Sequence, residues 1–281
     1  MRIVLTLIAA VLAGCGGDSS SEGRTVVAAF YPLAFAAQEI GGDEIDVQSM
    51  TPPGVEPHDL ELAGSDVRAI AAADLVLYLG EGFQPAIEDA IDSTSAHAVD
   101  LLDAVETREG GEDEHGVDPH VWLDPSRYAA IAARIGEELE RRKDAERFAA
   151  ELRTLDRDFR RGLSRCERDE IVTSHAAFGY LAERYGLRQV AITDVSPEAE
   201  PTPRELEDVI RQVRAVGATT VFFETLVSPR LAETVAREVG AKTAVLDPLE
   251  GLTEEELAAG GDYFSVMRGN LATLREGLGC R

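Results

Sequence analysis

The sequence has little positive charge. Lysine and arginine together number 27, against 52 aspartate and glutamate residues, and the formal net charge is -25. A chain with this balance repels phosphate backbones, which argues against nucleic-acid binding. A cationic ligand remains compatible with the composition.

The sequence also lacks a hydrophobic run of the roughly 20 residues that a membrane-spanning helix needs. The apolar run from Ile3 to Ala13 follows the basic Arg2 and ends in small residues before Cys15. This pattern is typical of an export signal. The ending LAGC resembles a bacterial lipobox, which implies that residues 1–14 are a lipoprotein signal peptide and that Cys15 is lipidated. A plain secretion signal with a chance cysteine is the alternative.

Residues 15–24, CGGDSSSEGR, are small and polar and predict a flexible tether. We therefore expect an exported monomer, anchored through its lipid to the outer face of the cytoplasmic membrane, or periplasmic in a cell with two membranes. Cysteines are few: beyond Cys15 only Cys166 and Cys280 remain. In an oxidising compartment these two can pair, and two free thiols are the alternative.

The order of apolar runs predicts an α/β protein. From Thr25 onward, short apolar runs alternate with helix-length segments, as in βαβ units with a mainly parallel sheet. A second series of the same kind begins at Glu170. Since 281 residues exceed the usual size of one domain, we predict two lobes, over residues 25–144 and 165–281. The acidic stretch 106–117 predicts a surface loop.

A long helix is predicted between the lobes, over residues 145–164. The segment is rich in Ala, Leu, Glu and Arg, which favour helices. Its apolar side chains recur at three- and four-residue steps and predict one buried stripe: Phe148, Leu152, Leu155, Phe159 and Leu163. Because a helix has few soft dihedrals, we expect this connection to be rigid and closure of the lobes to be small.

Three of the five histidines follow predicted strands: His58, His120 and His175. Ligand sites of open α/β sheets gather at the carboxyl ends of the strands, so we expect these imidazoles to share a cleft between the lobes. Imidazole suits Zn²⁺. We expect His97 and His115 to lie outside the site.

A four-coordinate zinc site needs one more donor. Asp247, at the end of the predicted strand AKTAVLD, is the candidate that we favour. Glu250 is the nearby competitor, and Glu56 and Glu61 are more distant alternatives. Manganese is the less favoured ion, because it prefers more oxygen donors.

The stretch DPHVWLDP is expected to form a turn that holds His120 in place. Its two prolines bracket a short, stiff turn that carries His120, and Trp122 is expected to anchor the turn. Pro125 suits the first turn of a helix that begins near Ser126.

Four stretches resemble the zinc-uptake solute-binding proteins of bacterial ABC transporters, the ZnuA type within the cluster 9 metal-binding family. They are PGVEPHDLE, DPHVWLDP, VTSHAAFGYLAERYGL and VLDPLEGLTEEELAAGGDYFSVMRGNL. The resemblance extends from about Val26 to Leu278. It implies two lobes, each with a four-stranded parallel sheet flanked by helices, joined by one long helix and holding a metal ion between them.

The resemblance also implies residue roles and partners. The family's metal ligands fall on His58, His120, His175 and Asp247, and its disulfide on Cys166 and Cys280. The implied function is capture of Zn²⁺ outside the cytoplasm and delivery to a membrane permease with a cytoplasmic ATPase. Many relatives have a long, histidine-rich loop where this chain has a short acidic one.

Three alternatives remain open. A manganese-binding protein of the same fold is one, although manganese-type relatives commonly carry glutamate at the position of His175. A zinc hydrolase is the second, although the sequence lacks an HExxH helix, a glycine-rich phosphate loop and a G-x-S-x-G elbow around Ser174. A lipid-anchored adhesin of this fold is the third. Because the sequence lacks these enzyme motifs, we expect the protein not to be an enzyme.

Overall fold

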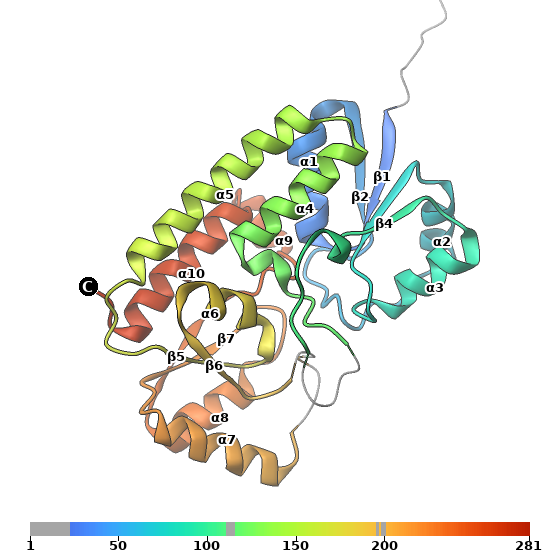
Figure 1. Cartoon of the computed structure of the whole chain (residues 1–281). Helices are drawn as coiled ribbons and strands as arrows, with labels where there is room; N and C mark the ends of the chain where they lie inside the picture. The colour runs from blue at the N-terminus through green and yellow to red at the C-terminus, as the bar shows by residue number, and fades with distance from the viewer. Residues whose placement is uncertain (1–22, 111–115, 195–196, 198–200) are drawn as a thin grey trace, which may run out of the picture.

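Each half of the chain forms a sheet of four parallel strands (Figure 1). The computed structural model describes residues 23–110, 116–194, 197 and 201–281. The strand order is β2-β1-β3-β4 in the first sheet and β6-β5-β7-β8 in the second. The strands are β1 (Arg24–Ala28), β2 (Ile45–Ser49), β3 (Leu75–Tyr78), β4 (Ala98–Asp100), β5 (Glu170–Thr173), β6 (Arg188–Ala191), β7 (Thr220–Phe223) and β8 (Lys242–Val245). The predicted two-lobed α/β fold is confirmed.

Helices flank both sheets (Figure 1). The α-helices are α1 (Tyr31–Gly41), α2 (Gly64–Ala72), α3 (Pro85–Thr94), α4 (Pro125–Glu138), α5 (Arg142–Gly162), α6 (Gly179–Tyr185), α7 (Pro203–Ala215), α8 (Arg230–Val239), α9 (Glu254–Ala258) and α10 (Tyr263–Leu278). In the part of the chain that the structure describes, none is long and apolar enough to span a bilayer. The predicted signal peptide, Cys15, residues 16–22 of the tether and His115 lie outside the described residues.

Local sequence explains where the key helices begin. α4 starts at Pro125, as predicted, and the side chain of Asp124 caps it by accepting a hydrogen bond from Ser126 N. α7 and α9 begin with capping boxes, in which the threonine side chain accepts from the third backbone N–H and a glutamate accepts in return. These caps satisfy amide groups that the first helical turn leaves without partners.

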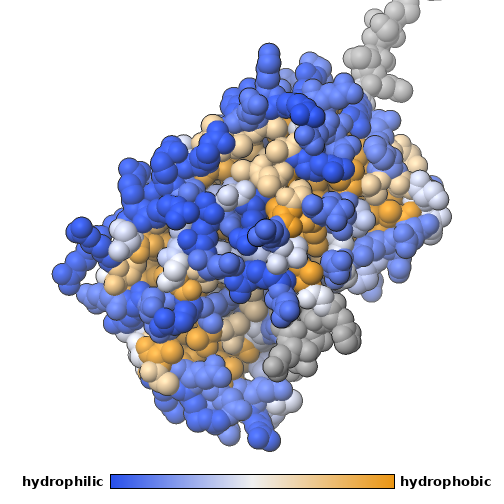
Figure 2. All heavy atoms as spheres, viewed as in Figure 1, coloured by the Kyte–Doolittle hydropathy of each residue, from blue (hydrophilic) through white to orange (hydrophobic). Residues whose placement is uncertain are grey.

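The predicted connecting helix corresponds to α5, Arg142–Gly162, in the structure. The apolar stripe is buried, with Leu152, Leu155 and Phe159 fully covered. The stripe faces α1, α4 and α10, while hydrophilic residues cover much of the outer face along α5 (Figure 2). α5 therefore leads from the first sheet to the second while packing against helices of both halves.

The structure joins Cys166 and Cys280 in a disulfide across 114 residues of sequence. Two backbone amides, Glu167 N and Arg168 N, donate to Leu278 O beside it. The end of α10 is thereby attached to the segment that enters β5.

The buried stripe of α5 predicts a specific loss of stability on truncation. Replacing Leu155 by Ala leaves a cavity between α5 and its neighbours and is expected to lower the free energy of unfolding by about 2–5 kcal/mol. Arg153, exposed on the same helix, is the matched control, and R153A is expected to change it by less than about 0.5 kcal/mol. Urea denaturation of both variants measures the difference, and similar losses would contradict the packing described here.

Candidate metal site

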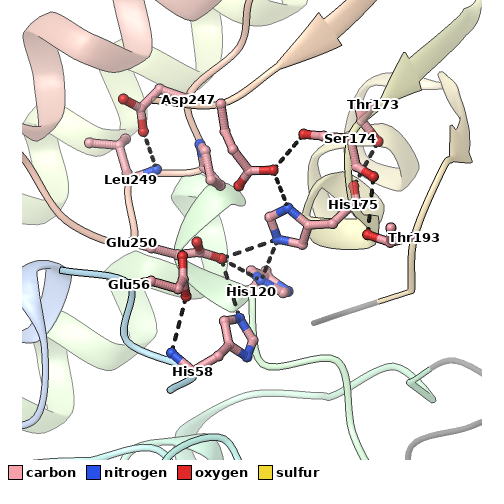
Figure 3. Close-up of polar contacts among 12 residues, drawn as sticks. Glu56, His58, His120, Thr173, Ser174, His175, Thr193, Asp247, Leu249 and Glu250 are labelled. Atoms are coloured by element: carbon pink, nitrogen blue, oxygen red, sulfur yellow. Dashed lines mark hydrogen bonds and ion pairs between the residues drawn. The ribbon is translucent and has the colours of Figure 1, made fainter. Parts of the chain in front are cut away.

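Four side chains converge between the two lobes: His58, His120, His175 and Glu250 (Figure 3). One donor atom from each lies within 4.8 Å of the others. Glu250 Oε1 is 2.9 Å from His120 Nε2, 3.2 Å from His175 Nε2 and 3.4 Å from His58 Nε2. The side chains are 0–1% exposed except that of His58, at 9%.

The fold explains why these residues meet. His58 follows β2, His175 follows β5 and Glu250 follows β8, each beyond the carboxyl end of a parallel strand. His120 immediately precedes a short 3-10 turn, Val121–Leu123, that leads into α4. Because the carboxyl ends of parallel strands open onto one edge of each sheet, both lobes present their loops to the same place.

The turn that carries His120 is held on both sides. Asp118 Oδ1 accepts hydrogen bonds from the backbone N and from Nδ1 of His120, at 3.0 and 2.9 Å. Trp122 Nε1 donates to Pro248 O at 2.7 Å, and Tyr263 OH donates to Trp122 O at 2.7 Å. Trp122 thus anchors the turn, as predicted, but to elements of the second lobe.

His175 has a carboxylate behind it as well. Glu224 Oε1 accepts from His175 Nδ1 at 2.8 Å and from the hydroxyl of Ser174. His58 differs: its ring packs edge-on against Phe83, with centroids 4.8 Å apart, and its backbone N donates to Glu56 Oε1. Two of the three imidazoles are therefore held by a carboxylate at the nitrogen that faces away from the site.

Among the predicted donors, Asp247 does not join the cluster, and Glu250 stands in its place. The reason is the turn after β8. Asp247 Oδ1 accepts from Leu249 N at 2.7 Å and Oδ2 accepts from Thr225 Oγ1 at 2.9 Å, so the aspartate closes the turn (Figure 3). Leu249 has a positive φ of 59°, which redirects the chain and brings Glu250 into the cleft.

The remaining candidates lie around the site or away from it. Glu56 is beside Glu250, and burial, with the neighbouring charge of Glu250, raises its pKa to about 9 (Figure 3). Glu61 and His97 are exposed, and the His97 ring contacts Asp74 O. Neither Glu56, Glu61 nor His97 belongs to the four-residue cluster.

Sequence reasoning missed Asp118 and Glu224. Asp118 stands two residues before His120, and Glu224 directly follows β7. A signal existed for Glu224: TTVFFE ends a strand-like run in an acidic residue, just as EIVTSH ends one in a histidine. What the sequence does not show is that β5 and β7 are neighbours, which places these two strand ends together.

The electrostatics of the cluster favour a cation. Burial lowers the pKa of His175, but the charges of Glu224 and Glu250 outweigh it and raise that pKa well above its ordinary value. For His120, burial likewise lowers the pKa, and its hydrogen bonds to Asp118 and Glu250 raise it overall. Burial raises the pKa of Glu250, yet the neighbouring imidazoles hold it well below its usual range.

Three imidazole nitrogens and one carboxylate oxygen form a donor set that zinc accepts in four-coordinate geometry. The buried carboxylates behind His120 and His175 match the arrangement that orients histidine ligands in metal sites. The residues therefore fit a zinc ion chemically.

Comparison with known proteins identifies relatives of the whole chain. The zinc-binding protein AdcA of Streptococcus pyogenes serotype M6 is 35% identical over 289 residues, which cover 91% of this chain and 56% of that protein. The chain thus spans about half the length of that curated relative.

Two solved structures share the fold. The laminin-binding protein Lmb of Streptococcus agalactiae, described as bifunctional with adhesin and metal-transporting activity, superposes with a TM-score of 0.81 at 30% identity, covering 91% of this chain and all of that one. The Zn(II)-bound ZnuA-like domain of Streptococcus pneumoniae AdcA gives a TM-score of 0.78 at 34% identity, covering 91% and 99%. The family model for the periplasmic zinc-uptake complex component A matches residues 26–277, and the chain belongs to this ZnuA family.

Proposed function

We propose that the protein captures Zn²⁺ outside the cytoplasm and delivers it to an ABC-type permease that is driven by a cytoplasmic ATPase. The observation that carries this proposal is the buried cluster of three histidines and Glu250 between two lobes. Membership of the ZnuA family supports zinc as the cargo, and so does the zinc-bound state of the similar AdcA domain.

The cluster explains how zinc is held. His58, His120 and His175 bind the ion through Nε2 of their neutral rings, and Glu250 supplies one carboxylate oxygen. Three nitrogen donors favour zinc over manganese, which prefers more oxygen. The near-complete burial of the four side chains keeps water away from the bound ion and strengthens its attraction to Glu250.

The same geometry favours a carrier over a zinc hydrolase. A catalytic zinc keeps one coordination position open for water, whereas four protein donors close the shell. Here the fourth position is taken by Glu250 Oε1, which lies within 3.4 Å of all three imidazoles. We propose that the protein is not an enzyme.

Adhesion is a second candidate function, because Lmb is described as an adhesin as well as a metal transporter. Adhesion would depend on surface residues, and likeness in fold does not identify them. Metal capture rests on named side chains at measured separations and is the function that we favour.

We further propose that the protein is tethered to the membrane through Cys15, as its LAGC sequence indicates. Replacing Cys15 by Ser is expected to move the protein from the membrane fraction to the soluble exported fraction, with zinc binding unchanged. Fractionation and immunoblotting after expression in a bacterial host measure this. A C15S variant that remains with the membrane would argue for another mode of attachment.

Two carboxylates three residues apart give the sharpest test of the metal site. Replacing Glu250 by Gln removes the charged donor. Zinc affinity is expected to fall by more than about 100-fold, because losing a residue that only supports a metal ligand typically costs about 10–100-fold. D247N is the matched control: its turn hydrogen bonds can persist, and affinity is expected to stay within about twofold of wild type. Competition titrations with a zinc chelator measure both. If D247N lost zinc affinity and E250Q did not, Asp247 rather than Glu250 would be the fourth donor.

The raised pKa values of His120 and His175 predict how zinc affinity depends on pH. Protons compete with zinc for these rings, so affinity falls as pH decreases through the range where the rings become protonated. Because both pKa values are raised above the ordinary ~6.5, the fall begins at a higher pH than an unperturbed histidine would give, with a slope of about tenfold per pH unit for each proton displaced. Calorimetric titrations at about pH 8 and about pH 6 test this. Equal affinity at both would contradict histidine ligation.

A further inference from the structure

Glu224 is a buried carboxylate whose charge has no evident role in stabilising the fold. It is 2% exposed, and its Oε2 is buried without a hydrogen-bond partner. Among the described residues, its ion-pair contact is with His175 and includes no arginine or lysine. A buried carboxylate whose one ion-pair partner is an imidazole is costly whenever that ring is neutral, as it must be to bind a metal ion. The residue therefore calls for an explanation other than stability.

The one oxygen of Glu224 that is engaged acts on His175. Oε1 accepts from His175 Nδ1 at 2.8 Å and from the Ser174 hydroxyl. A carboxylate that accepts at Nδ1 keeps the proton of the neutral ring on that nitrogen, and Nε2 is then free to bind a metal ion. Nε2 faces the cluster, 3.2 Å from Glu250 Oε1.

Strand register explains why Glu224 can reach the ring. β5 and β7 are parallel neighbours, with Val172 beside Val221 and Thr173 beside Phe222. Two more residues along each strand bring the chain to His175 and to Glu224. The carboxylate thus comes from the rigid edge of the same sheet, which holds the ring at a fixed angle.

Asp118 shows the same arrangement at His120, but with different support. It accepts from both the backbone and the ring of His120, and Arg108 Nε lies 3.9 Å from its other oxygen. Asp118 therefore also shapes its turn and has a positive charge nearby. Glu224 is the simpler case, because within the described part of the chain its hydrogen bonds are only with Ser174 and His175.

We propose that Glu224 is a positioning residue of the zinc site, which orients His175 for metal binding and adds negative charge behind it. This inference rests on the proposed function, since it assumes that the cluster binds zinc. The charge of Glu224 lies one imidazole ring away from the ion, where a dication offsets the cost of its burial.

Variants at one position separate orientation from charge. Glu224→Ala removes both the acceptor and the charge. It is expected to lower zinc affinity about 100-fold, the upper end of the range for residues that support a metal ligand. Glu224→Gln keeps an oxygen that can accept from Nδ1 but removes the charge, and about a tenfold loss is expected. Asp100→Asn is the control: Asp100 also ends a parallel strand, β4, and accepts from the backbone amides of Gly80 and Leu102, but it contacts no imidazole of the described residues. Its affinity is expected to stay within about twofold of wild type.

A spectroscopic measurement distinguishes positioning from general structural damage. Cobalt(II) bound in place of zinc absorbs visible light according to the geometry of its ligands. The spectrum of the cobalt-loaded protein is expected to change in E224A, because the His175 ring loses its fixed angle. It is expected to be close to wild type in E224Q, which keeps the acceptor, and to stay unchanged in D100N.

The measurements on these variants either support or overturn the positioning role of Glu224. Zinc affinity of E224A and E224Q within about twofold of wild type, or equal losses in E224Q and D100N, overturns the inference. If E224A does not fold, E224Q decides by its affinity alone. Failure of the proposed function is distinguishable, because then wild type itself binds no zinc or E250Q binds like wild type. Wild-type binding that is lost in E250Q and kept in the Glu224 variants rejects only the role of Glu224.

Discussion

One carboxylate oxygen shared by three imidazoles is the interaction on which the rest of this structure depends. Glu250 Oε1 lies within 3.4 Å of Nε2 of each histidine, in a place that water barely reaches. No single lobe contains all four groups, since His58 and His120 precede α5 in the chain and His175 and Glu250 follow it. The cluster therefore exists only while the two sheets direct their carboxyl edges at each other.

Contacts between the lobes support the geometry of the cluster. Trp122 Nε1 bonds to Pro248 O, beside the turn that carries Glu250. Arg184 of α6 lies 3.0 Å from Asp124, at the start of α4, and 2.7 Å from Asp156 of α5, so it connects three helices. The contacts of Trp122 with Pro248 and of Arg184 with Asp124 join the two lobes, and Arg184 also contacts the helix between them. α5 also packs against helices of both halves, and the small lobe closure expected from this helical connection stays a prediction.

The sequence predicted the fold and three members of the cluster well, because both depend on local patterns. Alternating apolar runs identify parallel strands, and a polar residue directly after such a run lies at the sheet edge. The preference for Asp247 over Glu250 is not matched by the cluster in the structure, for the opposite reason. Aspartate before proline often closes a turn through its own side chain, and which of two nearby carboxylates then faces the cleft depends on backbone angles such as the positive φ of Leu249. Glu224 was missed because strand order is a tertiary property.

Burial of several carboxylates at one point has a consequence for the whole protein. Asp118, Glu224 and Glu250 are each at most 3% exposed, and among the residues that the structure describes only Asp118 has an arginine within 4.0 Å. Such charges oppose folding unless protons or a cation offset them. A dication that binds the folded protein and not the unfolded chain raises stability in proportion to the logarithm of its concentration over its dissociation constant. On the proposed function, the groups that make the metal-free cleft costly are the same groups that stabilise the loaded protein, so the affinity for zinc is coupled to the stability of the fold.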